Sequence, residues 1–274
     1  MNTENDERII KEVIKLLNLN YENHKYFNDG ACSKVILLNN KYLIKQNNPT
    51  LLKGEIEFLS LNKQDLLQKI IYVHPNYEYA VYDFIKGNTM KRVVSVDDTI
   101  IKLVEIVNNY KEYNKGKYGY FEEQVDSWNE FLLEEINSSN KNLKEYIPNN
   151  SFVIECANEL EKYSFSKKLL HGDFGTHNFI EKDNKLVGII DPEPVLGDSL
   201  YDILFAFVSN VDILKNITLK RLETLLNDDI RKVYAMFVIV LYSRISRCLK
   251  YHKEDIDIYM NYWKYLESKK SNYL

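Results

Sequence analysis

Residues 171–178 form a short polar segment that leads into a strand–turn–strand pattern. The segment reads H-G-D-F-G-T-H-N, so Asp173 and Asn178 have the spacing D-x-x-x-x-N. Apolar residues at 179–180 and 186–190 flank the polar run 182–185, which is typical of two short antiparallel strands joined by a tight turn. A second acid, Asp191, follows directly. Because a hairpin brings the chain back beside its starting point, the pattern predicts that Asp173, Asn178 and Asp191 share one small volume.

Three oxygen-bearing side chains in one small volume suit phosphoryl transfer from a nucleotide. One carboxylate faces the attacking hydroxyl, while an amide oxygen and a second carboxylate hold magnesium on the phosphates. Protein kinases space their catalytic Asp and a metal-binding Asn in the same way. We therefore predict Asp173 as the catalytic base and Asn178 and Asp191 as magnesium ligands. Because Asp191 precedes a proline, we expect it to have extended backbone geometry.

The form H-G-D-x-x-x-x-N, with Gly where protein kinases carry Arg, resembles the aminoglycoside phosphotransferase and choline kinase superfamily. Residues 190–202, I-D-P-E-P-V-L-G-D-S-L-Y-D, are similar to that family's I-D-x-x-x-x-x-x-G-D-x-x-Y-D segment. The resemblance implies an α+β, bilobed, protein-kinase-like fold with a small β-rich N-terminal lobe and a larger, mainly α-helical C-terminal lobe. It also implies that Asp198 and Asp202 brace the catalytic loop and cap the next helix.

Hydrophobic patterning along the chain also predicts a β-rich first third followed by a mainly helical remainder. Two helices are predicted in the first third, at 9–17 and 51–67. Strand patterns occur at 26–27, 35–38, 42–45, 70–73 and 79–84. Helical patterns then dominate, at 100–113, 125–136, 152–160, 200–208, 219–226 and 230–249. We predict a nucleotide-binding lobe of residues 1–86 and a catalytic and substrate-binding lobe of residues 87–274.

Lys45 follows the apolar residues 42–44 at the end of a predicted strand. In protein kinases, the lysine that contacts the α- and β-phosphates has the same position at the end of an apolar strand. A helix glutamate should hold this lysine in place, either Glu55 or Glu57. Glu55 is favoured because Leu59 completes an E-x-x-x-L pattern that the resemblance implies. A phosphate-binding lysine is expected to add little to the core, so Lys45→Ala should leave the fold intact.

The remaining nucleotide contacts follow from the resemblance. The loop 28–33 has a single glycine and is either a bare turn or a phosphate cover. In the second case its amides at 31–33 and the Ser33 hydroxyl meet the phosphates, and the backbone of Asp83 and Ile85 binds adenine. The implied cofactors are ATP, with GTP left open, and Mg2+. Glu193 is a candidate third metal ligand, and the role of His177 stays open.

Composition limits the partners. With 40 acidic against 36 basic residues, the net charge of −4 argues against a nucleic-acid backbone as partner. Three scattered cysteines without a C-x-x-C pair predict reduced thiols. No secretory signal opens the chain and its apolar runs are far shorter than the roughly 20 residues of a membrane span. We expect a cytoplasmic protein that binds no membrane, as a monomer or a dimer.

The sequence therefore predicts a small-molecule kinase that moves the γ-phosphoryl group of ATP to a hydroxyl. The resemblance favours an aminoglycoside-type antibiotic as the acceptor, a cationic molecule that acidic residues such as Glu122 and Glu123 could contact. Those acids could equally be a solvated surface. Choline, ethanolamine or a sugar is the alternative acceptor, and a non-catalytic nucleotide-binding pseudokinase is the alternative class.

Overall fold

The computed structural model describes residues 3–27, 33–251 and 253–274. Its N-terminal part is built on a five-stranded antiparallel sheet with the order β1-β2-β3-β5-β4. The strands are β1 (His24–Phe27), β2 (Lys34–Leu38), β3 (Tyr42–Gln46), β4 (Ile70–Val73) and β5 (Ala80–Asp83). Asn39 and Asn40, both with φ near +50°, form the tight turn between β2 and β3. All five strands predicted from the patterning are present.

Helices α1 (Thr3–Leu16) and α2 (Pro49–Leu61) belong to the same part of the molecule. The apolar side chains of α1 form a separate small core with the sheet, made by Ile9, Ile10, Val13, Ile36, Leu38, Ile44, Tyr79 and Val81. Helix α2 begins where the Asn48 side chain accepts a hydrogen bond from the Thr50 amide, with Pro49 in the first turn.

The prediction that this second helix continues to residue 67 is wrong. Helix α2 ends at Leu61, and Asn62 leaves the helix. The buried Asn62 side chain donates to the Leu169 carbonyl (3.2 Å) and accepts from the Lys111 amide (2.8 Å). The Asn62 side chain is therefore committed to the helical part of the molecule. The apolar pattern of residues 51–67 does not reveal these contacts, and so it predicts a longer helix.

The C-terminal part is mainly helical. Its helices are α3 (Val96–Asn108), α4 (Trp128–Leu143), α5 (Ser151–Leu160), α6 (Leu200–Ser209), α7 (Val211–Leu214), α8 (Leu219–Leu225), α9 (Ile230–Tyr251), α10 (Ile256–Ser268) and α11 (Lys270–Tyr273). Helix α9 is buried along most of its length and contacts α4, α5, α6 and α10. A helix with so little exposed surface forms the centre of this core. No helix within the described ranges has the length and apolar character needed to cross a membrane.

Short strands connect these helices. A four-stranded sheet has the order β8-β7-β12-β9, and a three-stranded sheet has the order β11-β10-β6. Their bounds are β6 (Asn88–Thr89), β7 (Tyr118–Tyr120), β8 (Gln124–Val125), β9 (Lys168–Leu170), β10 (Phe179–Lys182), β11 (Lys185–Ile189) and β12 (Val195–Gly197). Strands β10 and β11 form the predicted hairpin, and single-turn 3-10 helices occur at Thr176–Asn178 and Lys253–Asp255.

Several expected boundaries in this part are wrong. Residues 109–113 lie outside α3, and Val125 belongs to strand β8 instead of opening a helix. Helix α4 starts at Trp128 because the Ser127 hydroxyl accepts from the Glu130 amide (3.1 Å). Strands β7, β9 and β12 were not predicted, since each has only three residues and carries too little periodicity to be recognised.

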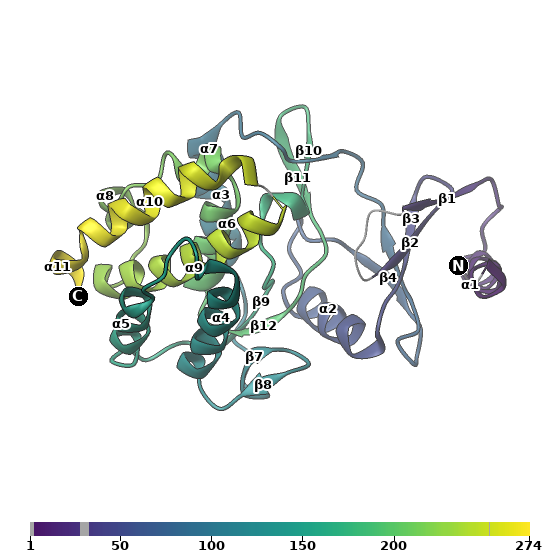
Figure 1. Cartoon of the computed structure of the whole chain (residues 1–274). Coiled ribbons are helices and arrows are strands. Elements are labelled where there is room, and N and C mark those ends of the chain that lie inside the picture. The colour runs from purple at the N-terminus through teal and green to yellow at the C-terminus, as the bar shows by residue number, and fades with distance from the viewer. Residues whose placement is uncertain (1–2, 28–32, 252) are drawn as a thin grey trace.

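The two parts meet at the hairpin (Figure 1). The Gln68 amide donates to the Ile189 carbonyl (3.0 Å), and the Ile189 amide donates to the Leu66 carbonyl (2.7 Å). These backbone bonds join the segment after α2 to the end of β11. The predicted α+β organisation, β-rich first and helical afterwards, is confirmed.

Candidate active site

The loop 171–178 follows strand β9 and is fixed by a fully buried carboxylate. Asp202, in the first turn of α6, accepts from the amides of His171 (2.8 Å) and Gly172 (3.1 Å). Gly172 has φ +80°, and a Cβ atom there would lie 1.8 Å from the Glu193 carbonyl oxygen. Only glycine fits this position. The sequence H-G-D therefore encodes one backbone path that presents Asp173.

His171 braces the loop from inside. Its ring is buried between Phe58 and Phe174, and Nε2 donates to the Ile190 carbonyl (3.0 Å). Burial lowers the pKa of His171 to about 4, so the ring is neutral at physiological pH. This contact ties the loop to the end of the hairpin.

Asp173 uses its two carboxylate oxygens differently. Oδ2 lies 2.8 Å from Nε2 of His177 and accepts from Nδ2 of Asn178 (2.9 Å). Within the described ranges, no hydrogen bond reaches Oδ1. Burial alone would raise the pKa of Asp173, but His177, His171 and Arg247 outweigh it and lower the pKa to about 2. The group is an ionised carboxylate with one oxygen available to an acceptor.

Asn178 and Asp191 line the same cavity. The Asn178 amide nitrogen donates to the backbone and the side chain of Asp173, which leaves its oxygen as the atom able to bind a metal. The Asp191 side chain is 54% exposed and contacts the Lys45 ammonium, a cation. An amide oxygen and an accessible carboxylate fit the ligands that Mg2+ prefers.

The expected extended geometry of Asp191 is wrong, because its φ is +61°. Both backbone groups of the preceding Ile190 are engaged, its amide with the Asn178 carbonyl (3.0 Å) and its carbonyl with His171. The chain turns sharply after this anchored residue, and Asp is one of the few residue types that adopt the left-handed region readily. Strained backbone of this kind is common at functional sites.

Lys45 and Glu55 form a buried ion pair that joins strand β3 to helix α2. Lys45 Nζ, on β3, lies 2.6 Å from Oε2 of Glu55, on α2, and also contacts Asp191. Burial alone would lower the pKa of Lys45, but Glu55 and Asp191 raise it, so the lysine is charged. Glu57 lies elsewhere, where it accepts from the Tyr113 hydroxyl (3.1 Å). Of the two candidate glutamates, Glu55 is the one that contacts Lys45.

Two neighbouring cavities share Ser33, Lys45 and Asp191 in their walls. One, of about 220 Å³, is polar and also includes Asp173, with Glu122 and Glu193. The other, of about 380 Å³, has an apolar lining made by Phe27, Val35, Leu43, Phe84, Ile85, Ile180 and Ile190. An apolar cavity next to one lined by charged residues suits the base and the phosphates of a nucleoside triphosphate.

The predicted adenine contacts differ in their surroundings. Ile85 lines the apolar cavity, and its backbone groups make no hydrogen bond among the described residues. Asp83 lies outside that lining, and its amide already donates to the Lys69 carbonyl (3.0 Å). Ser33 borders both cavities, while positions 28–32 of the predicted phosphate cover lie outside the described residues.

Sequence reasoning missed one cluster beside Asp173. Nη1 of Arg247, on α9, lies 3.8 Å from Oδ1 of Asp173, and its Nη2 lies 3.8 Å from Oε2 of Glu135, on α4. The Tyr120 hydroxyl, on β7, donates to Oε1 of the same glutamate (3.2 Å). No motif contains these residues, and only the packing of three distant elements brings them to the loop.

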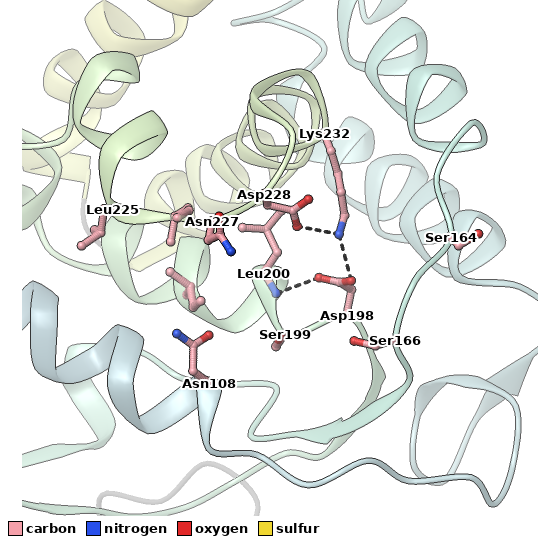
Figure 2. Close-up of a pocket in the computed structure, with 12 residues that line it drawn as sticks. Asn108, Ser164, Ser166, Asp198, Ser199, Leu200, Leu225, Asn227, Asp228 and Lys232 are labelled. Atoms are coloured by element: carbon pink, nitrogen blue, oxygen red, sulfur yellow. Dashed lines mark hydrogen bonds and ion pairs between the residues drawn. The ribbon is translucent and has the colours of Figure 1, made fainter.

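A larger cavity, of about 510 Å³, lies around the start of α6 (Figure 2). Lys232 is buried there between Asp198 (3.2 Å) and Asp228 (2.7 Å), and Asp198 also accepts from the Leu200 amide (2.9 Å). The Lys232 ammonium pairs with both carboxylates, and its contact with Asp198 joins α9 to the start of α6. Asp198 therefore has a bracing position, as Asp202 does.

Comparison with known proteins gives a match only at the level of structure. The sequence matches no protein-family model and no curated protein. A mutant aminoglycoside 2′-phosphotransferase-IIIa in complex with GDP superimposes with a TM-score of 0.61 at 15% identity, covering 97% of each chain. A thermostable mutant of aminoglycoside phosphotransferase APH(4)-Ia, solved with AMP-PNP and hygromycin B, gives 0.64 at 13% identity, covering 94% of this chain and 97% of that one.

A third solved structure, the GDP and kanamycin complex of APH(2″)-IIIa, gives a TM-score of 0.59 at 16% identity, covering 97% of this chain and 99% of that one. Matches that span nearly both chains at such low identity establish the fold. The chain has the bilobed, protein-kinase-like fold of the aminoglycoside phosphotransferases.

Proposed function

We propose that the protein is a magnesium-dependent phosphotransferase that moves the γ-phosphoryl group of ATP to a hydroxyl of a small molecule. One observation carries the proposal: Asp173, Asn178, Asp191 and the Lys45–Glu55 pair line two adjoining cavities between the sheet and the helical part. A structural role would not require an ionised carboxylate with a free oxygen in the same cavity as a buried, charged lysine. GTP stays an alternative donor.

In this proposal each residue has a separate task. Lys45, held by Glu55, contacts the α- and β-phosphates, and Ser33 borders the same space. Asn178 and Asp191 would hold Mg2+, which when bound would neutralise charge on the phosphates. Oδ1 of Asp173 accepts the proton of the attacking hydroxyl while the hydroxyl oxygen bonds to the γ-phosphorus. The bond from that phosphorus to the bridging oxygen breaks and ADP leaves, so no covalent enzyme intermediate forms.

The nucleotide base fits the apolar cavity. Its walls include Leu43, Phe84 and Ile180, which suit a flat ring, and the free backbone groups of Ile85 are available as hydrogen-bond partners. Because Asp83 already uses its amide within the protein, Ile85 is the stronger of the two predicted base-binding positions.

The leading acceptor is an aminoglycoside-type antibiotic. Solved structures of the same fold contain hygromycin B or kanamycin. In this chain, Glu122 and Glu193 share the polar cavity with Asp173 and can pair with ammonium groups. A metabolic kinase of choline, ethanolamine or a sugar is the alternative within the same chemistry. A pseudokinase is disfavoured because Lys45, Asp173, Asn178 and Asp191 are all present.

The test is an ATP-consumption screen with Mg2+ across aminoglycosides, macrolides, choline and sugars. We expect turnover with at least one aminoglycoside, with a KM that rises with salt because exposed charge pairs are screened. Turnover of choline or a neutral sugar alone would assign a metabolic kinase. Nucleotide binding without turnover of any acceptor would support the pseudokinase.

A further inference from the structure

The side chain of Arg247 has hydrogen-bonding capacity that the protein does not use. Its closest carboxylate oxygens, on Asp173 and Glu135, are both 3.8 Å away, which is longer than a hydrogen bond. None of the hydrogen bonds among the described residues involves this guanidinium, which is 34% exposed and lies over the Phe205 ring. An arginine carries five N–H donors in a fixed planar fork. The guanidinium is therefore held between two carboxylates with its donors available to a ligand.

The position of this charge relative to Asp173 is specific. His177 and Asn178 engage Oδ2, so an acceptor hydroxyl donates to Oδ1. This is also the oxygen that lies 3.8 Å from Nη1 of Arg247. A hydroxyl at the usual distance of about 2.7 Å from Oδ1 shares that oxygen with the guanidinium, whose Nη1 lies 3.8 Å from it. Substituents on the carbons beside that hydroxyl are then the first acceptor groups that Arg247 meets.

We propose that Arg247 determines which acceptor hydroxyl is phosphorylated. Its guanidinium donates to an oxygen on a carbon next to the reacting hydroxyl, whereas an ammonium group in that position has no lone pair to accept this hydrogen bond. The favoured acceptor is a vicinal diol without an amino group on either neighbouring carbon. This inference rests on the proposed function and narrows it.

The amino groups of a cationic acceptor have a separate location in this arrangement. Glu122 and Glu193 line the polar cavity together with Asp173, whereas Arg247 and Glu135 do not. Ammonium groups therefore bind on the cavity side, and the oxygen-rich edge of the acceptor faces α9. Choline and ethanolamine, whose nitrogen lies on the carbon next to the hydroxyl-bearing one, are poor fits.

Kanamycin is the probe, because it offers both kinds of hydroxyl in one molecule. The full chain is incubated with Mg-ATP and kanamycin, and the phosphorylated position is identified by NMR. Steady-state kinetics then compare wild type, Arg247→Met and Arg247→Lys, with choline as a second acceptor. Arg244→Met is the matched control, since Arg244 lies one turn earlier on α9 and donates to the Tyr259 hydroxyl (3.1 Å).

We expect the phosphate on a hydroxyl whose two neighbouring carbons carry no amino group. Arg247→Met should lower kcat/KM for kanamycin by about tenfold or more, the scale of a lost charge-assisted hydrogen bond, without changing the KM for ATP. It should also reduce the preference for kanamycin over choline. Arg247→Lys should keep the charge but lose part of the rate, because the planar fork is missing. Arg244→Met should behave as wild type.

Two results overturn the inference. One is a phosphate placed beside an ammonium-bearing carbon by the wild-type protein, a result that does not depend on any variant folding. The other is unchanged kanamycin kinetics in both Arg247 variants. Failure of the proposed function is distinct, because the wild type would then phosphorylate no acceptor in the panel of aminoglycosides, macrolides, choline and sugars.

Discussion

Replacing Glu55 with glutamine tests the buried ion pair at the centre of the site. Glu55 is 1% exposed and Lys45 is 5% exposed, and their charged atoms are 2.6 Å apart. Glutamine keeps the shape of glutamate but removes its charge. Losing one partner of a buried pair costs about 3–5 kcal/mol. Because Asp191 still contacts the lysine, we expect the lower end of that range, about 3 kcal/mol.

Thermal unfolding and phosphoryl-transfer kinetics measure the two consequences. At about 2–4 °C per kcal/mol for a chain of this size, Tm should fall by roughly 6–12 °C. The rate of transfer should fall by about 10–100-fold, the scale of losing a partner that orients a site residue. Glu57→Gln is the matched control on the same helix. It should stay within about 1 kcal/mol of wild type because Glu57 makes a partly exposed hydrogen bond with Tyr113 and an exposed ion pair with Lys115 (3.8 Å).

Two results would contradict this prediction: Glu57→Gln as the more damaging change, or no effect of Glu55→Gln on either Tm or the rate.

The burial of the pair also changes the expectation for Lys45→Ala. That substitution would leave the buried Glu55 carboxyl without its lysine partner, so it should destabilise the fold as well as the site.

The other predictions concern the loop and the metal ligands. Asp173→Asn should lower kcat by roughly 10²-fold or more with the KM for ATP unchanged, and steady-state kinetics with near wild-type turnover would remove Asp173 as the base. Asn178→Ala and Asp191→Ala should both weaken Mg-ATP binding in isothermal titration, Asp191→Ala more because it removes a full charge, and unchanged affinity in both would exclude the metal site. His171 and Asp202 should give opposite pH dependences of stability. Burial lowers the pKa of His171 from 6.5 to about 4, so its contribution is complete above pH 6.5 and is lost as pH falls towards 4. Burial raises the pKa of Asp202 from 3.8 to about 7, so its contribution is complete below pH 3.8 and is lost as pH rises through 7. Asp202→Asn should therefore make urea stability fall more steeply than in wild type between pH 7 and 4, and parallel curves would contradict this.

Local patterns predicted the parts of the site that lie close together in sequence. The spacing of Asp173 and Asn178, the hairpin and the following acid are all short-range features, and the structure brings them to two adjoining cavities. The choice of Glu55 over Glu57 also came from a local pattern. In each case a turn, a strand or one helical turn fixes the geometry.

Features that depend on tertiary contacts were not predictable in this way. The left-handed backbone of Asp191 follows from the anchoring of Ile190 by both ends of the loop 171–178. The early end of α2 follows from contacts of Asn62 with Leu169 and Lys111. Arg247 reaches Asp173 only because α9 packs in the centre of the helical core. No periodicity or motif encodes such long-range placements.

Transfer of labelled γ-phosphate from ATP to a small-molecule acceptor tests the central claim most directly. Wild type and Asp173→Asn are incubated with Mg-ATP and the acceptor panel, and the acceptors are analysed by mass spectrometry. Our account predicts that an acceptor gains one phosphate with wild type, that chelation of Mg2+ prevents the transfer, and that the variant is nearly inactive. Binding of Mg-ATP without phosphate gain on any acceptor, or equal transfer by both proteins, would contradict it.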